Sequence, residues 1–461
     1  MAISADPHIS RAVPDNPLPR RVQATAIRNF HIGFEMLRDA GGPVTRLTLA
    51  PAWLAAPIVL TTSPQGAHDV LGNVDNGIDK AMLHEELLQL IGPNLFNVKH
   101  QPWLPRRRSL QPIFTEQNVR AFAGDMARAA QRIADAWQDD DLIDLDTECR
   151  RLTLFAWGRS MLGLDLDEHA GVIAESLETA LGYASDRVAA PVRLPSWLPL
   201  PARRRARSAA GVLDRLADGI LTDCRTDPGR DAPLVRALID AVDPVTGRGL
   251  ADEEIRSELI AFIAAGHDTT ATLLAYSLWA LGRYSHVQQM VSAEVDALGH
   301  RQLTLEDVPR LHYTVQVLHE ALRLCPPAAG VIREATRDVE IDGYRVESGS
   351  ILIVGISAIH RDPGLWDRPL LFDPDRFAPV VRKGIDRWQY LPFGAGPRAC
   401  IGDHFAMLEA ALALATVIGR CEIHSCSDVF PLRSPFTTVA DGPIRVRVAP
   451  RRPATTSVRR E

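Results

Sequence analysis

A lone cysteine stands in a loop rich in glycine and proline near the C-terminus, directly before an apolar helical pattern. The loop reads Phe393-Gly394-Ala395-Gly396-Pro397-Arg398-Ala399-Cys400-Ile401-Gly402, and a helix is predicted from about Asp403 to Ile418. Backbone N–H groups, the positive end of the helix and the nearby guanidinium favour thiolate over thiol. A thiolate held in this way is a metal ligand or a nucleophile. A plainer interpretation is a glycine-rich turn that carries one buried structural cysteine.

The loop resembles the haem-binding segment of the cytochrome P450 family, which has the pattern Phe-x-x-Gly-x-Arg-x-Cys-x-Gly. The fixed positions are Phe393, Gly396, Arg398, Cys400 and Gly402. The resemblance implies that the cofactor is haem b, iron protoporphyrin IX, with Cys400 as the axial thiolate ligand that favours O–O cleavage. It also implies the cytochrome P450 fold, which is α+β and mostly helical, with small β-sheets around a buried haem.

The distribution of periodic segments agrees with this class. Residues Val44–Thr62, Val331–Val346 and Ile351–Val354 contain β-like runs between turn residues, whereas Ala/Leu/Arg segments with helical spacing dominate residues 115–325. Helices in excess over small sheets indicate α+β. We expect one cytochrome P450 domain over residues 31–450. An N-terminal extension over 1–30 precedes it, and a disordered polar tail over 451–461 follows it.

The composition is that of a soluble globular enzyme, and within the family that the loop resembles this implies the bacterial type. Of the 461 residues, 46% are hydrophobic and 23% are charged, and a net charge of −6 gives no argument for nucleic acid as a partner. No N-terminal run approaches the ~20 apolar residues of a membrane span, so no transmembrane anchor is predicted. The six cysteines do not form a dense disulfide framework, which indicates a reducing, cytoplasmic location. Cys421 and Cys426 are interpreted as packing residues, and we expect a monomer.

A second motif lies inside a long predicted helix that has Asp252 as its N-cap and extends to about Gly282. It reads Ala265-Gly266-His267-Asp268-Thr269-Thr270. A helical glycine costs about 1 kcal/mol relative to alanine, and adjacent threonines compete for backbone carbonyls. The helix is therefore expected to open locally and to admit something small and polar.

This motif matches the family pattern Ala/Gly-Gly-x-Asp/Glu-Thr-Thr/Ser. The resemblance implies that Gly266 makes the groove for dioxygen, that Thr269 hydrogen-bonds the bound oxygen, and that Asp268 relays protons from solvent. The other interpretation is a threonine-rich kink with a surface acid.

Glu320 and Arg323 stand one turn apart on one face of another predicted helix. Such pairs are common on solvent-exposed helices, so this pair alone says little about function. The later segment Phe372–Phe377 contains Arg376, and in the family the helix pair and this arginine form a buried ionic triad. The resemblance therefore implies a structural triad of Glu320, Arg323 and Arg376.

Haem propionates need cations, and arginine suits a carboxylate because its guanidinium is forked and permanently charged. Trp103 and Arg107 stand one helical turn apart and resemble the family's Trp-x-x-x-Arg segment. Residues Val331–Ala335 resemble the strand that supplies a further propionate arginine, here Arg333. Arg398 of the cysteine loop is the third candidate.

The resemblance implies a haem-thiolate monooxygenase that inserts one oxygen atom of O2 into a hydrophobic molecule. No flavin or iron–sulfur segment is recognised, so a separate ferredoxin and ferredoxin reductase are expected to supply electrons. Arg106 and Arg108 are expected either to face an acidic redox partner or to be solvated charges. One alternative is a peroxide-driven haem-thiolate enzyme, although such relatives lack the acid–threonine pair. The other is a non-catalytic haem-binding sensor or carrier, in which an oxygen-activation motif would be unexplained.

The substrate is expected in an apolar pocket above the haem, with candidate walls at Leu83–Phe96, Leu177–Trp197, Ala328–Val331 and Pro435–Thr438. Within these walls and the long helix, the candidate pocket residues are Phe96, Phe262, Ala265 and Val331. Few charges line these segments, so a lipid-like substrate is expected. The Trp103 segment and the Arg398 form of the cysteine loop resemble those of fatty-acid-hydroxylating relatives, which implies a fatty acid. A steroid, a terpenoid and a polyketide are the alternatives.

The run Trp197-Leu198-Pro199-Leu200-Pro201 precedes several arginines. It allows peripheral contact with a membrane surface, but a proline-bounded loop before a basic helix is the preferred interpretation.

Overall fold

The computed structural model describes residues 11–51, 55–72, 77–166, 169–189, 198, 200–299 and 301–451. The predicted tail beyond Arg451 and most of the proline-bounded loop at 190–199 lie outside these residues, as does the predicted extension before Arg11.

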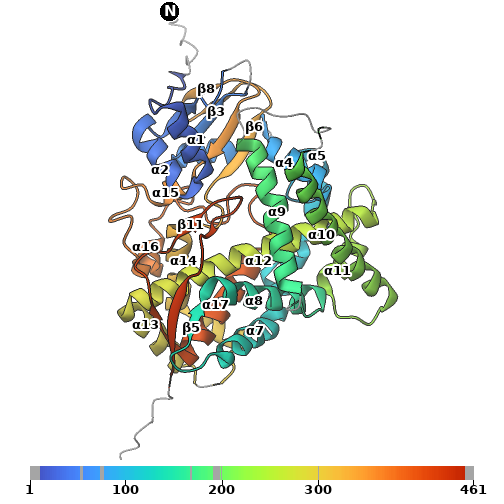
Figure 1. Ribbon diagram of the computed structural model, residues 1–461, viewed down its shortest axis with the longest axis vertical. Helices are drawn as coiled ribbons and strands as arrows, with labels where there is room; N and C mark the ends of the chain where they lie inside the picture. The colour runs from blue at the N-terminus through green and yellow to red at the C-terminus, as the bar shows by residue number, and fades with distance from the viewer. Residues whose placement is uncertain are drawn as a thin grey trace, which may run out of the picture.

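Helices make up most of the chain (Figure 1). Their bounds are α1 Arg20–Arg28, α2 Phe30–Gly41, α3 Pro64–Leu71, α4 Met82–Ile91, α5 His100–Leu110, α6 Glu116–Val119, α7 Ala123–Ala136, α8 Leu145–Trp157, α9 Ala170–Ala189, α10 Pro201–Thr226, α11 Pro233–Asp240, α12 Asp252–Arg283, α13 Ser285–Asp296, α14 His312–Leu324, α15 Ile356–His360, α16 Pro379–Arg382 and α17 Asp403–Arg420.

The strands form small sheets, as predicted. Their bounds are β1 Arg11–Ala12, β2 Val44–Leu47, β3 Ile58–Thr61, β4 Ile78–Asp79, β5 Leu142–Asp144, β6 Val331–Ala335, β7 Val339–Ile341, β8 Tyr344–Val346, β9 Ile351–Val354, β10 Cys421–Ser425, β11 Leu432–Arg433, β12 Val439–Ala440 and β13 Arg445–Pro450. The largest sheet has five strands in the order β2-β3-β9-β6-β4, and the others are β1-β8-β7, β10-β13-β5 and β11-β12.

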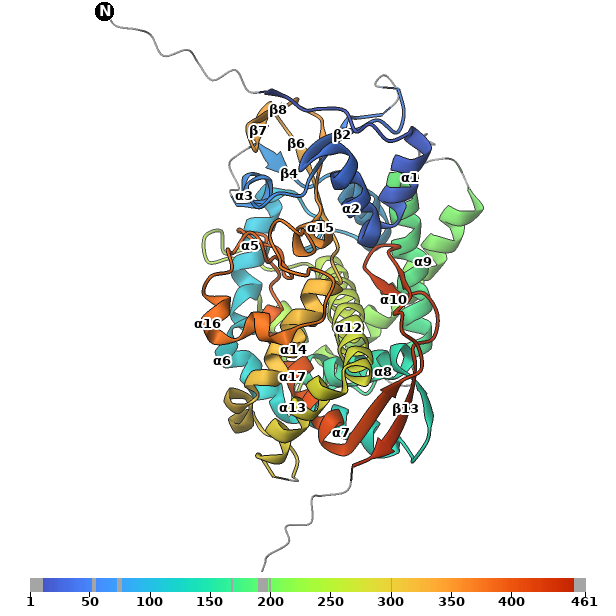
Figure 2. The same cartoon turned by 90° about the vertical axis from the view of Figure 1, so that its left-hand side faces the viewer.

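The five-stranded sheet and the β10-β13-β5 sheet lie at opposite ends of the molecule, with α12 crossing the middle between them (Figure 2). Helix α12 packs against α8, α10, α14 and α17. The apolar side chains of these helices form the main core, so the two motif-bearing helices, α12 and α17, are both central elements. The mostly helical α+β prediction is confirmed.

The N-terminal segment from Arg11 onward is part of the fold, so the predicted domain start at residue 31 is too late. Strand β1 pairs in parallel with β8. Helix α1 packs on α2, and its Gln23 side chain donates to Asn16 O and Leu18 O. A proline-rich composition suggested a free segment, but local composition does not reveal a pairing partner more than 300 residues away.

Two smaller predictions need correction. Helix α12 begins at Asp252, and its N-cap is Ala251, whose N–H donates to Glu254 Oε2 at 3.0 Å. Cys421 is buried as expected, but Cys426 is exposed and is not a packing residue.

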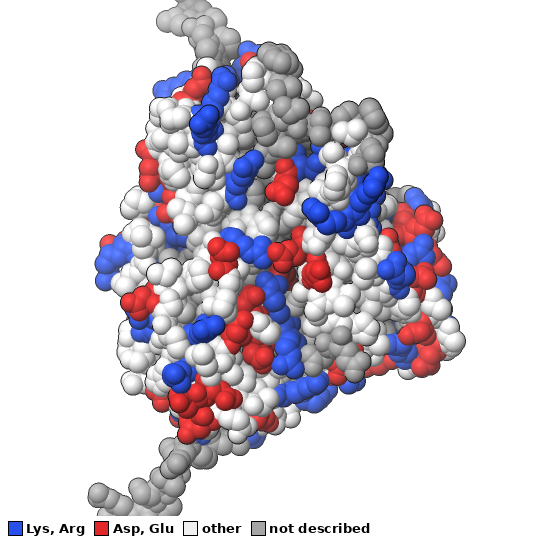
Figure 3. All heavy atoms as spheres, viewed as in Figure 1, with Lys and Arg blue, Asp and Glu red and all other residues white. Residues whose placement is uncertain are grey.

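One described helix, α12, is long and apolar enough to cross a membrane by length and composition. However, 61% of its most apolar window is buried inside the protein, as in the core helix of a globular domain. On the face of Figure 3, acidic and basic side chains are interspersed, and no field of one sign covers it.

Candidate active site

The cysteine loop is closed by its own backbone. Cys400 N donates to Phe393 O at 2.9 Å, and Gly402 N lies 3.4 Å from Cys400 Sγ. Gly396 has φ +71°, and a Cβ there would lie 1.8 Å from Leu71 O. Glycine is therefore required at this position, because the loop passes against the end of α3 in a left-handed conformation.

The expected lowering of the Cys400 pKa is wrong for the protein alone. The side chain is exposed, yet protein atoms surround it densely enough that desolvation raises the pKa of the thiol above its ordinary value. The Gly402 N–H and the Arg107 guanidinium lower the pKa, but they do not offset desolvation. A bound cation would reverse the balance, because a coordinating thiol is deprotonated by the metal.

A cluster of buried cations lies beside the loop. Arg333 is 9% exposed and Lys80 is 6% exposed. Burial and repulsion from Arg398 lower the pKa of Arg333 to about 10. For Lys80, burial and repulsion from Arg333 and Arg398 lower the pKa well below its ordinary value. Buried cations this close together require an anion. Asp79 partly supplies it, because its carboxylate raises the pKa of Lys80 and of Arg333.

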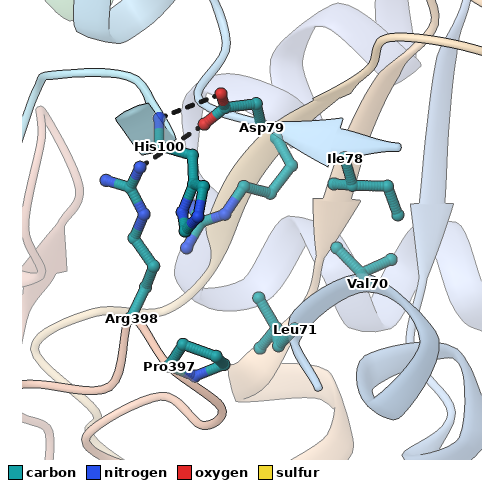
Figure 4. A pocket seen from close by; sticks show the side chains of 8 residues that line it. Val70, Leu71, Ile78, Asp79, His100, Pro397 and Arg398 are labelled. Carbon is teal, nitrogen blue, oxygen red and sulfur yellow. Dashed lines mark hydrogen bonds and ion pairs between the residues drawn. The ribbon is translucent and has the colours of Figure 1, made fainter. Parts of the chain in front are cut away.

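Asp79 is already engaged, as Figure 4 shows. Its carboxylate accepts from His100 N at 3.0 Å and lies 3.4 Å from an Arg398 guanidinium nitrogen. The imidazole Nδ1 of His100 is buried and has no hydrogen-bond partner among the described residues. A small cavity of about 20 Å³ lies between Asp79, His100, Arg333 and Arg398.

Lys80, His84 and His100 were missed by the sequence analysis. The Lys80 ammonium lies 3.2 Å from His84 Nε2 and 4.5 Å from the centre of the Phe96 ring. A signal was present, because the chain has only three lysines, Lys80, Lys99 and Lys383, and otherwise uses arginine. However, a lysine that directly follows an acid, Asp79, gave no reason to expect burial among arginines.

Trp103 and Arg107 support the loop in different ways. The Trp103 ring is 4% exposed, and the Arg398 guanidinium lies 4.5 Å from its centre. Arg107 donates to Ala399 O at 3.1 Å, inside the cysteine loop. Among the described residues, Arg107 therefore binds the loop backbone rather than joining the cation cluster.

Arg106 and Arg108 both form ion pairs within the protein. Arg106 is buried and forms ion pairs with Glu254 at 2.5 Å and Glu258 at 2.8 Å. Arg108 pairs with Asp243 at 2.7 Å. The expectation of an outward-facing charge is wrong for Arg106, because adjacent arginines on a helix point in different directions and this one enters the core, whereas the Arg108 side chain is 33% exposed.

The motif of α12 is contacted by two other elements, α8 and the loop between β11 and β12. Asp268 forms an ion pair with Arg150 of α8 through Oδ1, and its Oδ2 accepts from Thr437 Oγ1 at 2.6 Å. Arg150 also pairs with Asp146 at 2.9 Å. Burial lowers the pKa of Arg150, but the carboxylates of Asp268 and Asp146 outweigh it and raise the pKa above its ordinary value. Arg150 and Thr437 were not identified from the sequence.

The neighbours of Asp268 are also placed. Thr269 Oγ1 donates to Ala265 O at 2.7 Å, one turn back, and α12 continues through the motif without a break. The predicted local opening of α12 is absent. The Thr269 hydroxyl bonds to Ala265 O in addition to the backbone hydrogen bonds of the helix and does not replace them. His267 is buried, which lowers its pKa to about 4 and keeps it neutral.

Gly266 has a packing reason to be glycine. A Cβ at this position would lie 2.8–3.1 Å from the Trp157 indole ring of α8. Glycine therefore allows α12 and α8 to approach closely. The role of Gly266 in a dioxygen groove stays a prediction.

The structure brings the predicted triad together. Arg323 and Glu320 are fully buried and joined by two hydrogen bonds of 2.7 Å. Arg376 Nε lies 3.5 Å from Glu320 Oε1. Arg323 also donates to His360 O and Pro369 O. The triad thus joins α14 to the segments around residues 360 and 369–376.

The candidate pocket residues differ in exposure. Phe96 is 44% exposed, Ala265 is exposed and Val331 is half-buried. Phe262 is 6% exposed because its ring stacks on Phe114 at 5.3 Å, so little of it is left for a ligand. Of the predicted walls, the side chain of Leu83 and residues 190–197 lie outside the described part of the chain.

Comparison with known proteins identifies the family. The family model described as cytochrome P450 matches residues 14–446. The chain is a cytochrome P450. Cyclooctatin synthase of Streptomyces melanosporofaciens is 33% identical over 447 residues, which are 96% of each chain. Pentalenene oxygenase of Streptomyces avermitilis is 28% identical and matches 86% of this P450 and 87% of its own length.

Among solved structures, the crystal structure of the cytochrome P450DA heme domain matches with a TM-score of 0.84 and 26% identity, covering 96% of this P450 and 99% of that chain. The protein is therefore a haem-thiolate monooxygenase whose cofactor is haem with a cysteine ligand.

The residues present fit this cofactor. Haem carries two carboxylates, and the cluster of Lys80, Arg333 and Arg398 is a set of buried cations with too little negative charge of its own. Desolvated cations of this kind are stabilised by carboxylates in their midst. Cys400 lies at the head of α17 in the same region, on the loop that carries Arg398.

Proposed function

We propose that this P450 hydroxylates a cyclic terpenoid, with Cys400 as the axial ligand of the haem iron. The observation that carries the substrate class is the pair of relatives named for cyclooctatin and pentalenene, which match this P450 over nearly its whole length. The expected fatty acid substrate receives no support from these relatives. The terpenoid alternative of the sequence analysis is the one adopted.

The side chains around the candidate pocket agree with a bulky hydrocarbon. Phe436 packs with Leu87, Leu181 and Ile332, and its ring lies 5.9 Å from that of Phe96. Apolar walls of this kind hold a ligand by area and shape rather than by charge.

The residues of the site divide the work. Haem supplies the reductive activation of dioxygen when it is bound. Lys80, Arg333 and Arg398 would hold its carboxylates. Asp268 takes protons from solvent and passes them toward the hydroxyl of Thr269, the adjacent residue on α12. Positioned proton transfer is worth about 10²–10⁴ in rate, so both side chains matter for turnover.

Electrons come from a separate ferredoxin and reductase in the cytoplasm. The purified P450 with NAD(P)H alone is expected to be inactive, and adding both proteins is expected to restore turnover. Consumption of reductant with product formation also separates this proposal from a haem-binding sensor, which would bind ligands without turnover.

Optical titration of the ferric protein tests the substrate class. Cyclic terpenes and their alcohols should displace the water on the iron and change the spin state, whereas fatty acids of similar carbon number should not. Product analysis with ferredoxin and reductase then identifies the hydroxylated terpenoid. A spin-state change and hydroxylation with fatty acids, and neither with cyclic terpenoids, would overturn the proposal.

A further inference from the structure

The loop between β11 and β12 touches both the candidate substrate wall and the acid of α12. Thr437 Oγ1 donates to Asp268 Oδ2 at 2.6 Å, and Thr272 Oγ1 donates to Thr438 O at 3.1 Å. The preceding residue, Phe436, packs among Leu181 and Ile332 on the pocket side. Adjacent residues of one short loop therefore contact the apolar wall and the proton-relay candidate.

The Asp268 carboxylate is held from two sides. Arg150 binds one oxygen and Thr437 binds the other. Arg150 comes from the middle of α8 and also pairs with Asp146, so the partner of Asp268 Oδ1 is held in place. Thr437 comes from the loop of a strand pair of only two residues each, and a pair this short holds its loop less firmly than a long helix holds Arg150, although Thr438 is itself bonded to Pro327 O and Thr272 Oγ1.

A cavity of about 130 Å³ lies against this acid. Its lining includes Arg150, His267 and Asp268 on the polar side, and Leu181, Phe436 and Thr437 on the other. A cavity of this volume with polar groups on one wall has room for several water molecules. Asp268 thus faces a source of protons, while Thr437 and Arg150 both occupy its oxygens.

We propose that Thr437 is a positioning residue that couples substrate binding to proton delivery. A bulky substrate that presses on Phe436 displaces the loop and breaks the Thr437–Asp268 hydrogen bond. The released oxygen of Asp268 then accepts a proton from cavity water and gives it up toward Thr269. The carboxylate is regenerated, and solvent loses one proton per passage. This inference rests on the proposed relay role of Asp268.

If ligand binding and the Thr437–Asp268 hydrogen bond are coupled, removing the hydrogen bond should raise the affinity for the ligand. In the wild type, binding of a bulky ligand must break the hydrogen bond, so part of the binding free energy is lost. Thr437→Val removes the hydrogen bond beforehand and nearly preserves the shape of the side chain. The variant should therefore bind a bulky ligand more tightly, by roughly tenfold to a hundredfold for one hydrogen bond to a charged group.

The probes are clotrimazole, a bulky azole that ligates haem iron, and imidazole, which has the same ligating ring but is too small to reach the loop. Titration of the ferric holoenzyme should show tighter clotrimazole binding by Thr437→Val and unchanged imidazole binding. Thr437→Ser, which keeps the hydroxyl, should behave as wild type. The carbon monoxide difference spectrum shows that each variant is folded and loaded with haem.

Asp268→Asn separates this inference from the proposed function. In the Asp268→Asn background, which replaces the charged acceptor, Thr437→Val should change clotrimazole affinity much less. Equal clotrimazole affinity of wild type and Thr437→Val, or weaker binding by the variant, would overturn the coupling. If instead Asp268→Asn turns over as fast as wild type, the relay role itself is wrong, whatever the azole titrations show.

Discussion

At the scale of single residues, the cation cluster shows how a protein holds charges that are unfavourable on their own. Lys80, Arg333 and Arg398 each lose hydration on folding, and each repels the others. Such a group stabilises the protein only when an anion completes it, because a buried unpaired charge costs several kcal/mol. We therefore expect the cluster to favour the haem-bound state over the haem-free state.

Lys80→Met should release haem faster than wild type, because it removes one of the cations that we propose to hold the propionates. Transfer of haem to excess apomyoglobin measures this rate, and we expect an increase of about tenfold, corresponding to roughly 1.4 kcal/mol. The matched control is Lys99→Met, since Lys99 is 58% exposed and should show the wild-type rate. Equal rates for both variants would mean that Lys80 does not hold the cofactor.

The pH dependence of the haem-free protein follows from the same residue. The Lys80 pKa is lowered in the folded protein and ordinary, near 10.5, in the unfolded chain. At pH values between these two pKa values, Lys80 binds more protons in the unfolded chain than in the folded protein. The contribution of Lys80 to the free energy of unfolding therefore rises with pH. This part of the rise should be absent in urea titrations of haem-free Lys80→Met.

At the scale of elements, the motif of α12 serves packing as well as chemistry. Gly266 brings α12 against Trp157 of α8, and α8 also supplies Arg150, the partner of Asp268. A close approach of the two helices thus sets the position of the arginine relative to the acid. One glycine in the sequence has a role in helix packing that its motif alone did not indicate.

Gly266→Ala should be destabilising by about 1–3 kcal/mol, because the added methyl overlaps the indole and forces the helices apart. Gly219→Ala is the matched control: it lies in α10, has no atom within 4 Å of its would-be Cβ, and should gain about 0.5–1 kcal/mol from helix propensity. Urea unfolding followed by circular dichroism gives both values. A Gly266→Ala protein as stable as Gly219→Ala would show that the contact between α8 and α12 yields without cost.

At the scale of the whole molecule, the N-terminal segment packs against parts of the chain that are distant in the sequence. The N-terminal segment pairs β1 with β8, and α1 buries Ala26 and Ile27 in the cluster of Phe34, Leu37 and Ile353. The predicted boundary at residue 31 would cut through this unit.

Deletion of residues 1–28 should therefore lower the free energy of unfolding by about 2–5 kcal/mol, the range for removing large buried side chains. Deletion of residues 1–10 leaves β1 and α1 intact and should have little effect. Thermal unfolding of the two truncated proteins compares them directly. If both are as stable as the full chain, α1 contributes no packing energy.

The sequence by itself determined the family, the haem-binding loop, the acid–threonine motif and the pair on α14. These are contiguous patterns whose geometry follows from local backbone, as Gly396 and the Cys400–Phe393 hydrogen bond show. It did not determine the direction of the Cys400 pKa, because desolvation depends on how much protein surrounds the thiol.

Only the tertiary structure decided which charges meet. Arg150 and Asp268 are 118 residues apart, Asp268 and Thr437 are 169 apart, and Arg106 and Glu258 are 152 apart. Nothing in the local pattern of a charged residue distinguishes a solvated side chain from one with a buried partner. The packing of helices and loops that are distant in the sequence decides which of the two a charged residue becomes. Burying a charge costs several kcal/mol unless a counter-charge lies beside it.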